Sequence, residues 1–295
     1  MTQVTTPNPH IDFNTILPIE IIHKENSLSL LRLKQTSINT DLTEWSHTLR
    51  IKALQEIQGH SLELSIINQK KTNILLLTPL GLTNSKRQVK DGVVYFGSNF
   101  RDSNSNIIID YKLKLSNPIY GKKTLGPHFM VFFDLNKKTY FIRDLMVGLG
   151  TFVRVKEAMV LENDHLLSFG ETYILVNIVN WGHEGGYPKL RLKVIGGNNF
   201  SEIFYFTAQE FYLSTIVVGR NRNCQVYIED STVSKQHASI FFSIYKQWVI
   251  IDGTANRNSL NGTWVFASKD IELTANLEIK ACESVLKVLP QLCNY

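Results

Sequence analysis

The sequence lacks the long apolar segment that a membrane-spanning helix requires. No window of the 295-residue chain approaches eighteen uncharged apolar residues, whereas a spanning helix needs about 20. The first residues, MTQVTTPNPHIDFN, also lack a basic region followed by an apolar run, so a secretory signal is not expected. We therefore expect an intracellular protein without a membrane partner. Cytoplasm, cytoskeleton, cilium and nucleus all stay open as its location.

Cysteine is scarce, and combinations of residues typical of catalysis are missing. The three cysteines are Cys224, Cys282 and Cys293, without the spacing of a metal site. They suit a reducing compartment better than a disulfide framework. The acid–histidine pairs in suggestive places, Asp164–His165 and His183–Glu184, have no partner nucleophile, and no glycine-rich phosphate loop precedes a helix. We therefore predict no catalytic residue, no metal and no cofactor.

Positive charge exceeds negative charge only slightly. There are 31 Lys and Arg residues against 26 Asp and Glu residues, for a formal net charge of +5. The excess lies in residues 71–180, with 14 basic against 9 acidic residues, while residues 1–70 (6 against 7) and 181–295 (11 against 10) are balanced. Aromatic residues do not alternate with the basic ones, so a solvated surface is a better interpretation than a nucleic-acid-binding face. A nucleic-acid partner is not expected.

Short apolar strands dominate the sequence from about residue 73. Examples are NILLLTPLG, GVVYFG, HFMVFFDL and TYFIRDL, and later KLRLKVIGG, STIVVGR, HASIFFSIY and QWVIIDG. Many short strands separated by frequent turn residues are typical of antiparallel β-sandwiches. The sequence therefore predicts a mainly β protein.

The earlier and later strands resemble each other. The aligned pairs are Gly97 with Gly219, His128 with His237, and Gly150-Thr151 with Gly262-Thr263, at offsets of 122, 109 and 112 residues. These offsets predict a duplicated domain of about 110 residues. A glycine-rich stretch ending in proline, NWGHEGGYP, marks the boundary, which gives domains at 71–180 and 181–295.

Residues 1–70 have a different pattern. DLTEWSHTLRIKALQEIQG predicts one amphipathic helix over about 42–58, because apolar residues recur on one helical face. Those residues are Leu42, Trp45, Leu49, Ala53 and Ile57. Together with possible strands such as SLELSII, the helix forms either a small α+β module or an extension packed against the first sandwich.

Polar residues stand at the ends of strands in the second repeat. Arg220 follows TIVVG directly, and its planar guanidinium matches two oxygens of a tetrahedral anion. Ser234 adds a hydroxyl donor, and Asn261 offers a donor and an acceptor that suit an extended peptide main chain. This set predicts binding of a phosphate monoester on a peptide, without catalysis.

Residues around these three predict support of the site. Gly219 is expected to let the backbone turn, and His237 to act as a buried imidazole that orients Ser234. Thr263 is expected to brace the turn at Asn261-Gly262, although Asn-Gly alone is also common in ordinary hairpins. The ordered combination G-R, S-x-x-H and N-G-T across about 45 residues is more specific than any of its parts.

This arrangement resembles the forkhead-associated (FHA) domain over roughly Lys189 to Leu289. The resemblance implies an eleven-stranded β-sandwich that recognises phosphothreonine in partner proteins. Carried over by position, it places Arg220 and Ser234 on the phosphate and Asn261 on the peptide backbone. It further implies Lys235 as a phosphate or peptide contact, Arg222 as a selector of residues beyond the phosphothreonine, and Gly219, His237, Gly262 and Thr263 as structural residues.

The sequence departs from the FHA pattern in both repeats. In the second, Leu260 replaces a small hydroxylated residue, and IKACESVL replaces a polar strand start. In the first, Ser98, Leu125 and Leu149 stand where Arg220, Ser234 and Asn261 stand in the second. The ending LENDHLLSFGETYILV of the first repeat nevertheless matches the family's final strands better than the second repeat does. We therefore predict two tandem FHA-type sandwiches after a small helix-containing N-terminal region, the first without phosphate binding.

Two functions follow from these predictions. The first is a non-catalytic adaptor or scaffold that binds a phosphothreonine peptide of a partner protein through the C-terminal FHA domain. The alternative is a structural subunit of a large assembly, for example cytoskeletal or ciliary, that docks other protein subunits on both sandwiches without recognising phosphate. An enzyme is the third and least favoured possibility.

Overall fold

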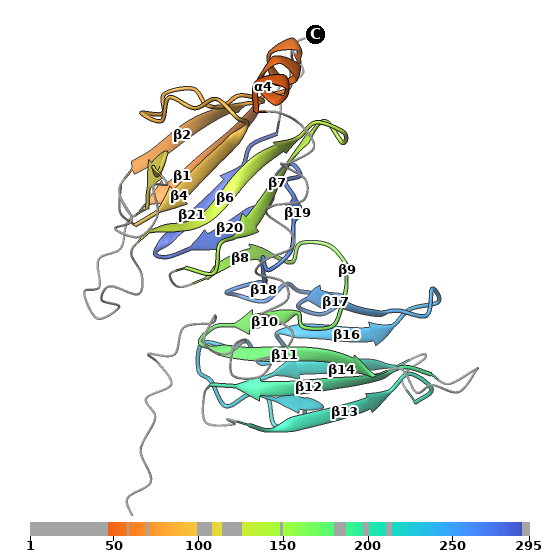
Figure 1. The fold of residues 1–295 in the computed structure, drawn as a ribbon. Helices are drawn as coiled ribbons and strands as arrows, with labels where there is room; N and C mark the ends of the chain where they lie inside the picture. Colours follow the sequence, from red (N-terminus) through yellow and green to blue (C-terminus); the bar gives the residue numbers. More distant parts are fainter. Residues whose placement is uncertain are drawn as a thin grey trace, which may run out of the picture.

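A computed structural model of the chain describes residues 47–57, 59–68, 71–98, 108–113, 126–147, 150–179, 187–196, 201–210 and 214–290. In these stretches the fold is mainly β, as the sequence predicts, with large antiparallel sheets and one small helix (Figure 1). None of these stretches contains a helix long and apolar enough to cross a membrane.

Apart from α4 and β3, which have no counterpart, the described elements fall into two series with the same order. The first repeat contains α4 (His47–Glu56), β1 (Leu62–Asn68), β2 (Lys71–Thr78), β3 (Gly81–Leu82), β4 (Val93–Gly97), β5 (Tyr111–Lys112), β6 (Pro127–Asp134), β7 (Thr139–Asp144), β8 (Thr151–Arg154), β9 (Met159–Val160), β10 (Leu166–Phe169) and β11 (Thr172–Val179). The second contains β12 (Lys189–Ile195), β13 (Ile203–Thr207), β14 (Thr215–Gly219), β15 (Val226–Tyr227), β16 (Ala238–Phe242), β17 (Trp248–Asp252), β18 (Thr263–Phe266), β19 (Ile271–Glu272), β20 (Glu278–Ala281) and β21 (Ser284–Val288). Strands β1 and β2 therefore correspond to β12 and β13, and β4 to β11 correspond to β14 to β21.

The two repeats exchange their last three strands. One five-stranded sheet has the order β15-β14-β16-β17-β9, and its counterpart has the order β5-β4-β6-β7-β19. The third sheet has the order β13-β12-β11-β10-β18-β8-β20-β21-β1-β2-β3. Strands β9 to β11 of the first repeat therefore complete the second sandwich, and β19 to β21 of the second repeat complete the first. In Figure 1, the blue strand β21 accordingly lies beside β1, and the green strand β11 lies beside β12.

Strands β8 and β18 join the two sandwiches just before the chain crosses over. They pair antiparallel, with Arg154 opposite Trp264 and Phe152 opposite Phe266. Strand β8 also pairs with β20, and β18 with β10, so the exchanged strands continue one sheet. The ion pair between Arg154 Nη1 and Glu278 Oε2 (2.8 Å) further ties β8 to β20.

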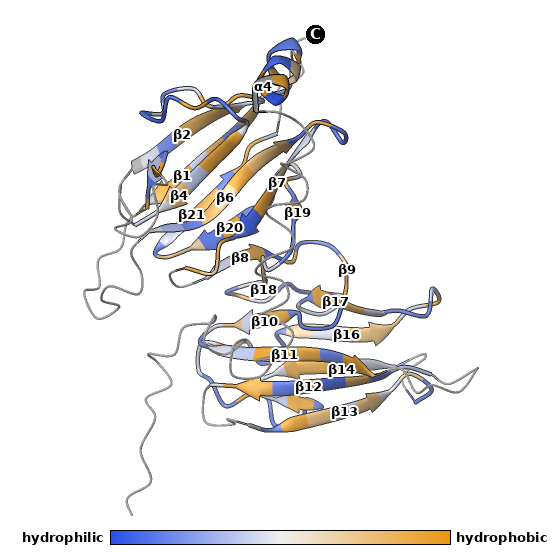
Figure 2. Ribbon diagram, in the orientation of Figure 1, coloured by the Kyte–Doolittle hydropathy of each residue, from blue (hydrophilic) through white to orange (hydrophobic). Residues whose placement is uncertain are grey.

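Apolar side chains from both repeats form the core. The main cluster includes Leu64 and Phe96 of the first repeat, Val218 of the second, and Phe169 of an exchanged strand, all fully buried. A second cluster lies at the junction and contains Phe152, Leu166, Leu175, Ile195, Trp264 and Phe266. Figure 2 shows the corresponding apolar segments along the strands and hydrophilic turns between them. Because burial of apolar surface is the main driving force of folding, the shared core makes the repeats depend on each other.

The N-terminal helix buries a different residue from the one its sequence pattern predicts. It spans His47–Glu56, where the sequence predicts about 42–58, and residues 42–46 lie outside the described residues. Leu54 is buried at 1% exposure and packs into the core, whereas Leu49 of the predicted apolar face is 54% exposed. The sandwich against which the helix packs, rather than the periodicity alone, selects the buried face. The described part of this region is thus an extension of the first sandwich.

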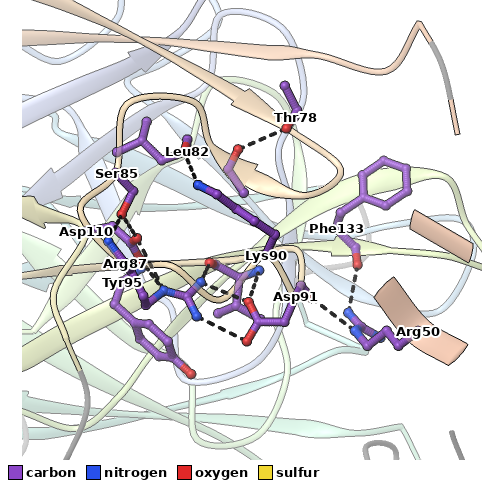
Figure 3. A network of polar contacts seen from close by, with 12 residues as sticks. Arg50, Thr78, Leu82, Ser85, Arg87, Lys90, Asp91, Tyr95, Asp110 and Phe133 are labelled. Carbon is purple, nitrogen blue, oxygen red and sulfur yellow. Dashed lines mark hydrogen bonds and ion pairs between the residues drawn. The ribbon is translucent and has the colours of Figure 1, made fainter. Parts of the chain in front are cut away.

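A buried arginine connects this helix with two loops of the first sandwich (Figure 3). The guanidinium of Arg87 donates to both carboxylate oxygens of Asp91 (2.8 and 3.1 Å) and to Asp110 Oδ2 (3.1 Å). From the helix, Arg50 donates to the main-chain oxygens of Asp91 (3.1 Å) and Phe133 (3.3 Å). Because Arg87 is only 8% exposed and fully paired, the cluster has a structural role.

Strand pairing does not follow the order of the repeats along the sequence. Strand β1 precedes residue 71, yet it pairs with β2 and β21. Strands β11 and β12 lie on opposite sides of residue 180 and are also neighbours. The division into 1–70, 71–180 and 181–295 stays a prediction about domains, while the hydrogen bonds of the sheets cross both of its boundaries.

The strand exchange predicts that a disulfide can join the first repeat to the second repeat in a double-cysteine variant. Ile67 and Val285 are register partners on β1 and β21, so Ile67→Cys with Val285→Cys should form a disulfide under mild oxidation. The test uses a chain whose native cysteines are replaced by serine and which has a protease site inserted within 181–186. After cleavage and denaturation, a non-reducing gel should show one band.

The matched control is Glu63→Cys with Leu76→Cys, register partners within the β1–β2 hairpin. This pair needs no exchange, so its oxidation shows that the conditions suffice. Two separate bands for the first variant, with an oxidised control pair, would contradict the exchange.

Candidate functional site

Three loops at one end of the second sandwich carry the predicted ligand-binding residues. Arg220 lies in the first loop, which follows β14. Ser234 and Lys235 lie in the second loop, which precedes β16, and Asn261 lies in the third, which precedes β18. The N–H of Arg220 donates to the carbonyl of Ser234 (3.1 Å), and the N–H of Asn221 donates to that of Lys235 (3.1 Å). These two bonds hold the first and second loops side by side, so the structure brings Arg220 and Ser234 together from positions fourteen residues apart.

Side-chain hydrogen bonds fix the third loop against the second. Ser234 Oγ accepts the backbone N–H of Leu260 (3.0 Å), which leaves the hydroxyl hydrogen of Ser234 able to donate to a ligand. Asn261 Nδ2 donates to the carbonyl of Thr232 (2.8 Å). The Oδ1 of Asn261 has no hydrogen-bond partner in the described part of the chain and can accept an N–H of a bound peptide.

The cationic side chains of the site are exposed. Arg220, Arg222 and Lys235 all lie at the surface, and none of them makes a side-chain hydrogen bond or ion pair with another described residue. Arg222 stands in the same loop as Arg220, but no hydrogen bond ties it to Ser234 or Asn261. Unpaired guanidinium and ammonium groups beside a hydroxyl donor can together bind a doubly charged tetrahedral anion.

His237 connects the second and third loops from below the surface. It is fully buried, and its Nδ1 accepts the backbone N–H of Ser234 (3.1 Å). Nδ1 therefore carries no hydrogen, and Nε2–H donates to the carbonyl of Gly262 (3.0 Å). Burial lowers the pKa of His237, although the bond to Gly262 and nearby Asp252 act in the opposite direction. The neutral ring is the form that both contacts require.

The two glycines of the site serve different purposes. Gly219 is needed for space rather than for a turn, because a Cβ there would overlap the carbonyl oxygen of Lys235, while its φ is not positive. This corrects the reason that the sequence suggests for Gly219. Gly262 has φ of +77°, and a Cβ there would lie 2.6 Å from Arg154 Nε. Both positions exclude a larger residue.

Asp252 and Ser259 support the site, although the sequence did not single them out. Asp252 Oδ1 accepts the hydroxyls of Ser259 (2.6 Å) and Thr263 (2.8 Å). Ser259 Oγ in turn accepts the backbone N–H of Gly262 (2.9 Å). Thr263 thus braces the Asn261-Gly262 turn through a carboxylate at the end of β17. An aspartate directly after the apolar run WVII was the available signal.

Asp230 is a second supporting carboxylate that the sequence did not reveal. Its Oδ1 accepts the N–H (2.8 Å) and hydroxyl (2.6 Å) of Thr232, and its Oδ2 accepts the hydroxyl of Thr172 (3.0 Å) and the N–H of Glu171 (3.1 Å). Burial raises its pKa, but these four donors outweigh burial and hold the pKa below its usual value. The spacing Asp-x-Thr indicates a local turn, whereas nothing local predicts the contact with residues 171–172.

The counterpart of the site in the first repeat has a serine at the position of Arg220. Ser98 stands in place of Arg220, is 8% exposed, and lies 3.1 Å from His128 Nε2 through its hydroxyl. The other ring nitrogen of His128 lies 2.9 Å from Cys282 Sγ of the exchanged β20–β21 hairpin. Leu125 and Leu149, the counterparts of Ser234 and Asn261, lie outside the described residues.

Asp144 is the counterpart of Asp252 and is less well satisfied. Its Oδ1 accepts the N–H of Met146 (2.7 Å), whereas the interaction of the carboxyl with Thr151 only partly offsets its burial. Burial raises the pKa of Asp144 to about 7. A carboxyl whose pKa is raised on folding stabilises the fold below its unfolded pKa and loses that stability as the pH rises to the folded pKa.

Asp144→Asn should therefore change how stability depends on pH. Relative to the unmodified chain, the variant should gain roughly 2 to 3 kcal/mol in free energy of unfolding between about pH 5 and about pH 8, because it cannot ionise. Urea unfolding of both proteins at the two pH values measures this difference. Parallel pH profiles would show that Asp144 carries no such shift.

Comparison with known proteins agrees with this geometry. A family model described as FHA domain matches residues 216–280, from β14 to β20. The matched segment contains Arg220, Ser234, Lys235 and Asn261. A search of curated proteins finds no match. FHA domains bind phosphopeptides as protein-interaction modules, and the match shows that residues 216–280 of this chain belong to an FHA domain.

Proposed function

We propose that the chain is a non-catalytic adaptor or scaffold that binds a phosphothreonine segment of a partner protein at the three loops of its second sandwich. The observation that carries this proposal is the exposed guanidinium of Arg220, held beside Ser234 by a backbone hydrogen bond. An arginine with this exposure and no acidic partner among the described residues is suited to a phosphate dianion.

Each residue of the site has a role in this proposal. Arg220 and the hydroxyl of Ser234 bind phosphate oxygens, and Lys235 adds positive charge from the second loop. Asn261 holds the peptide main chain through its amide. Arg222, further along the first loop, contacts acidic or polar residues of the partner near the phosphothreonine. Leu260 stands where FHA domains often have a hydroxylated residue. The missing hydrogen bond would be a neutral one, so its absence reduces the binding free energy by about 0.5–1.5 kcal/mol.

The alternative function, a structural subunit that docks other proteins without phosphate, has support in the first sandwich. Ser98 in place of Arg220 is buried and in contact with His128, so this repeat has no exposed arginine where the second repeat has one. A docking role for the first sandwich is compatible with a phosphopeptide reader in the second. The binding measurement below separates an adaptor from a purely structural subunit.

Arg220→Ala should abolish most phosphopeptide binding. Hydrogen bonds to charged groups contribute about 1.5–3 kcal/mol, so the Kd for the best peptide of a phosphothreonine library should rise roughly 10- to 150-fold. Fluorescence anisotropy with the full chain measures this change.

Lys246→Ala is the matched control, because it removes one exposed positive charge at the turn between β16 and β17, away from the three loops. It should leave the Kd within about twofold, since isolated surface charges have small effects. The proposal fails if no phosphothreonine peptide binds the unmodified chain better than its unphosphorylated form.

A further inference from the structure

The tip of the exchanged β10–β11 hairpin lies against the ligand-binding loops of the second sandwich. The tip consists of Phe169, Gly170, Glu171 and Thr172, with Phe169 and Thr172 as register partners. These residues belong to the first repeat by sequence, although the site residues belong to the second. The hairpin therefore belongs to the surroundings of the site, although it is not part of the second repeat.

One line of contacts leads from this hairpin to Asn261. The hydroxyl of Thr172 and the N–H of Glu171 donate to Asp230 Oδ2, and Asp230 Oδ1 accepts the N–H and hydroxyl of Thr232. The carbonyl of Thr232 then accepts the side-chain amide of Asn261 (2.8 Å). Asp230 is thus fixed from two sides, and the carbonyl that orients Asn261 is fixed with it.

A second line of contacts leads from the hairpin to Ser234. The ring of Phe169 lies edge-on to the ring of His237, with centroids 5.3 Å apart and an angle of 82°. His237 in turn accepts the N–H of Ser234 and donates to Gly262. The hairpin therefore contacts the residue that joins the second and third loops.

The tip fits closely against the second loop. Gly170 has φ of +61°, and a Cβ there would overlap Thr232 Oγ1 and approach Asp230 Oδ2 at 3.3 Å. A residue other than glycine would push the loop that holds Asn261. The close fit, the carboxylate bonds and the ring contact converge on the same loops.

We propose that the first repeat, through the tip of its β10–β11 hairpin and Thr172 above all, positions the phosphothreonine site of the second repeat. This inference rests on the proposed function of the site. It assigns a definite role to the repeat that has Ser98 in place of Arg220, and in this role Thr172 is a positioning residue that acts through Asp230. It also gives a reason why the first repeat keeps an FHA-like ending, LLSFGETYILV, since that ending completes the sandwich that carries Arg220.

The other exchanged hairpin provides a matched control. In β20–β21 the register partners Ala281 and Ser284 correspond to Phe169 and Thr172. Ser284 is 1% exposed, but its hairpin completes the first sandwich, where Ser98 stands in place of Arg220. A change at Ser284 tests for general destabilisation without touching the proposed site.

The experiment compares Thr172→Val and Ser284→Ala in the full chain. Thr172→Val keeps the side-chain shape and removes the hydroxyl, so the Kd for the best library phosphopeptide should rise about threefold to tenfold. Ser284→Ala should leave it unchanged. In the absence of peptide, hydrogen exchange of the Ser234 and Leu260 amides should accelerate in Thr172→Val and not in Ser284→Ala, because these amides donate within the loops.

The two readouts separate failure of this inference from failure of the proposed function. If the unmodified chain binds no phosphopeptide but Thr172→Val still accelerates exchange, the proposed function fails and the positioning role of the hairpin stands. If Thr172→Val matches the unmodified chain in both readouts, the inference is overturned. Equal losses in both variants would also overturn it, because they would show a general loss of stability.

Discussion

The pairing of β8 with β18 is the interaction on which the rest of the structure depends. It stands at the point where each repeat leaves its own sandwich, and it makes one continuous sheet of strands from both. Exchange of equivalent elements is a low-cost arrangement when two copies share a fold. Here both copies lie in one chain, so the exchanged strands are always present at a high effective concentration.

The strand exchange changes how the loops of the proposed site are understood. Arg220, Ser234 and Asn261 lie on three loops of the second repeat, yet the groups that hold these loops come from both repeats. The loops are fixed by a buried neutral histidine and two carboxylates, while the cationic groups stay exposed. Buried groups that fix the loops beneath exposed donors make the arrangement preorganised, so less conformational entropy is lost when a ligand binds.

The first sandwich has a similar framework, with Ser98 at the position of Arg220. Gly97 and Gly219 both end a strand where a Cβ would strike a neighbouring carbonyl, and His128 occupies the place of His237. The presence of these residues without an arginine at position 98 fits a repeat whose role is structural. The exchanged strands give a physical basis for that role, because neither sandwich is complete without the other repeat.

Much of the fold, and the residues that the structure brings together at the candidate site, could be predicted from local patterns in the sequence. The strands follow from short apolar runs between turns, and Arg220, Ser234 and Asn261 stand at strand ends within about 45 residues. The exchange could not be predicted, since β11 and β21 have similar patterns of apolar residues. A strand with either pattern could pair with β12. For the same reason the contact of Thr172 with Asp230, 58 residues apart, has no local signal. The exposed Leu49 shows that periodicity alone does not decide which helical residue is buried.

A titration followed by NMR tests the central claim most directly. The isotope-labelled full chain would be titrated with a phosphothreonine peptide while its amide resonances are recorded. The account predicts shifts at residues 220–222, 234–235 and 260–262, smaller shifts at 170–172 of the first repeat, and none at Ser98 or 282–284. Shifts centred elsewhere, or equal shifts with the unphosphorylated peptide, would contradict a phosphothreonine site built on both repeats.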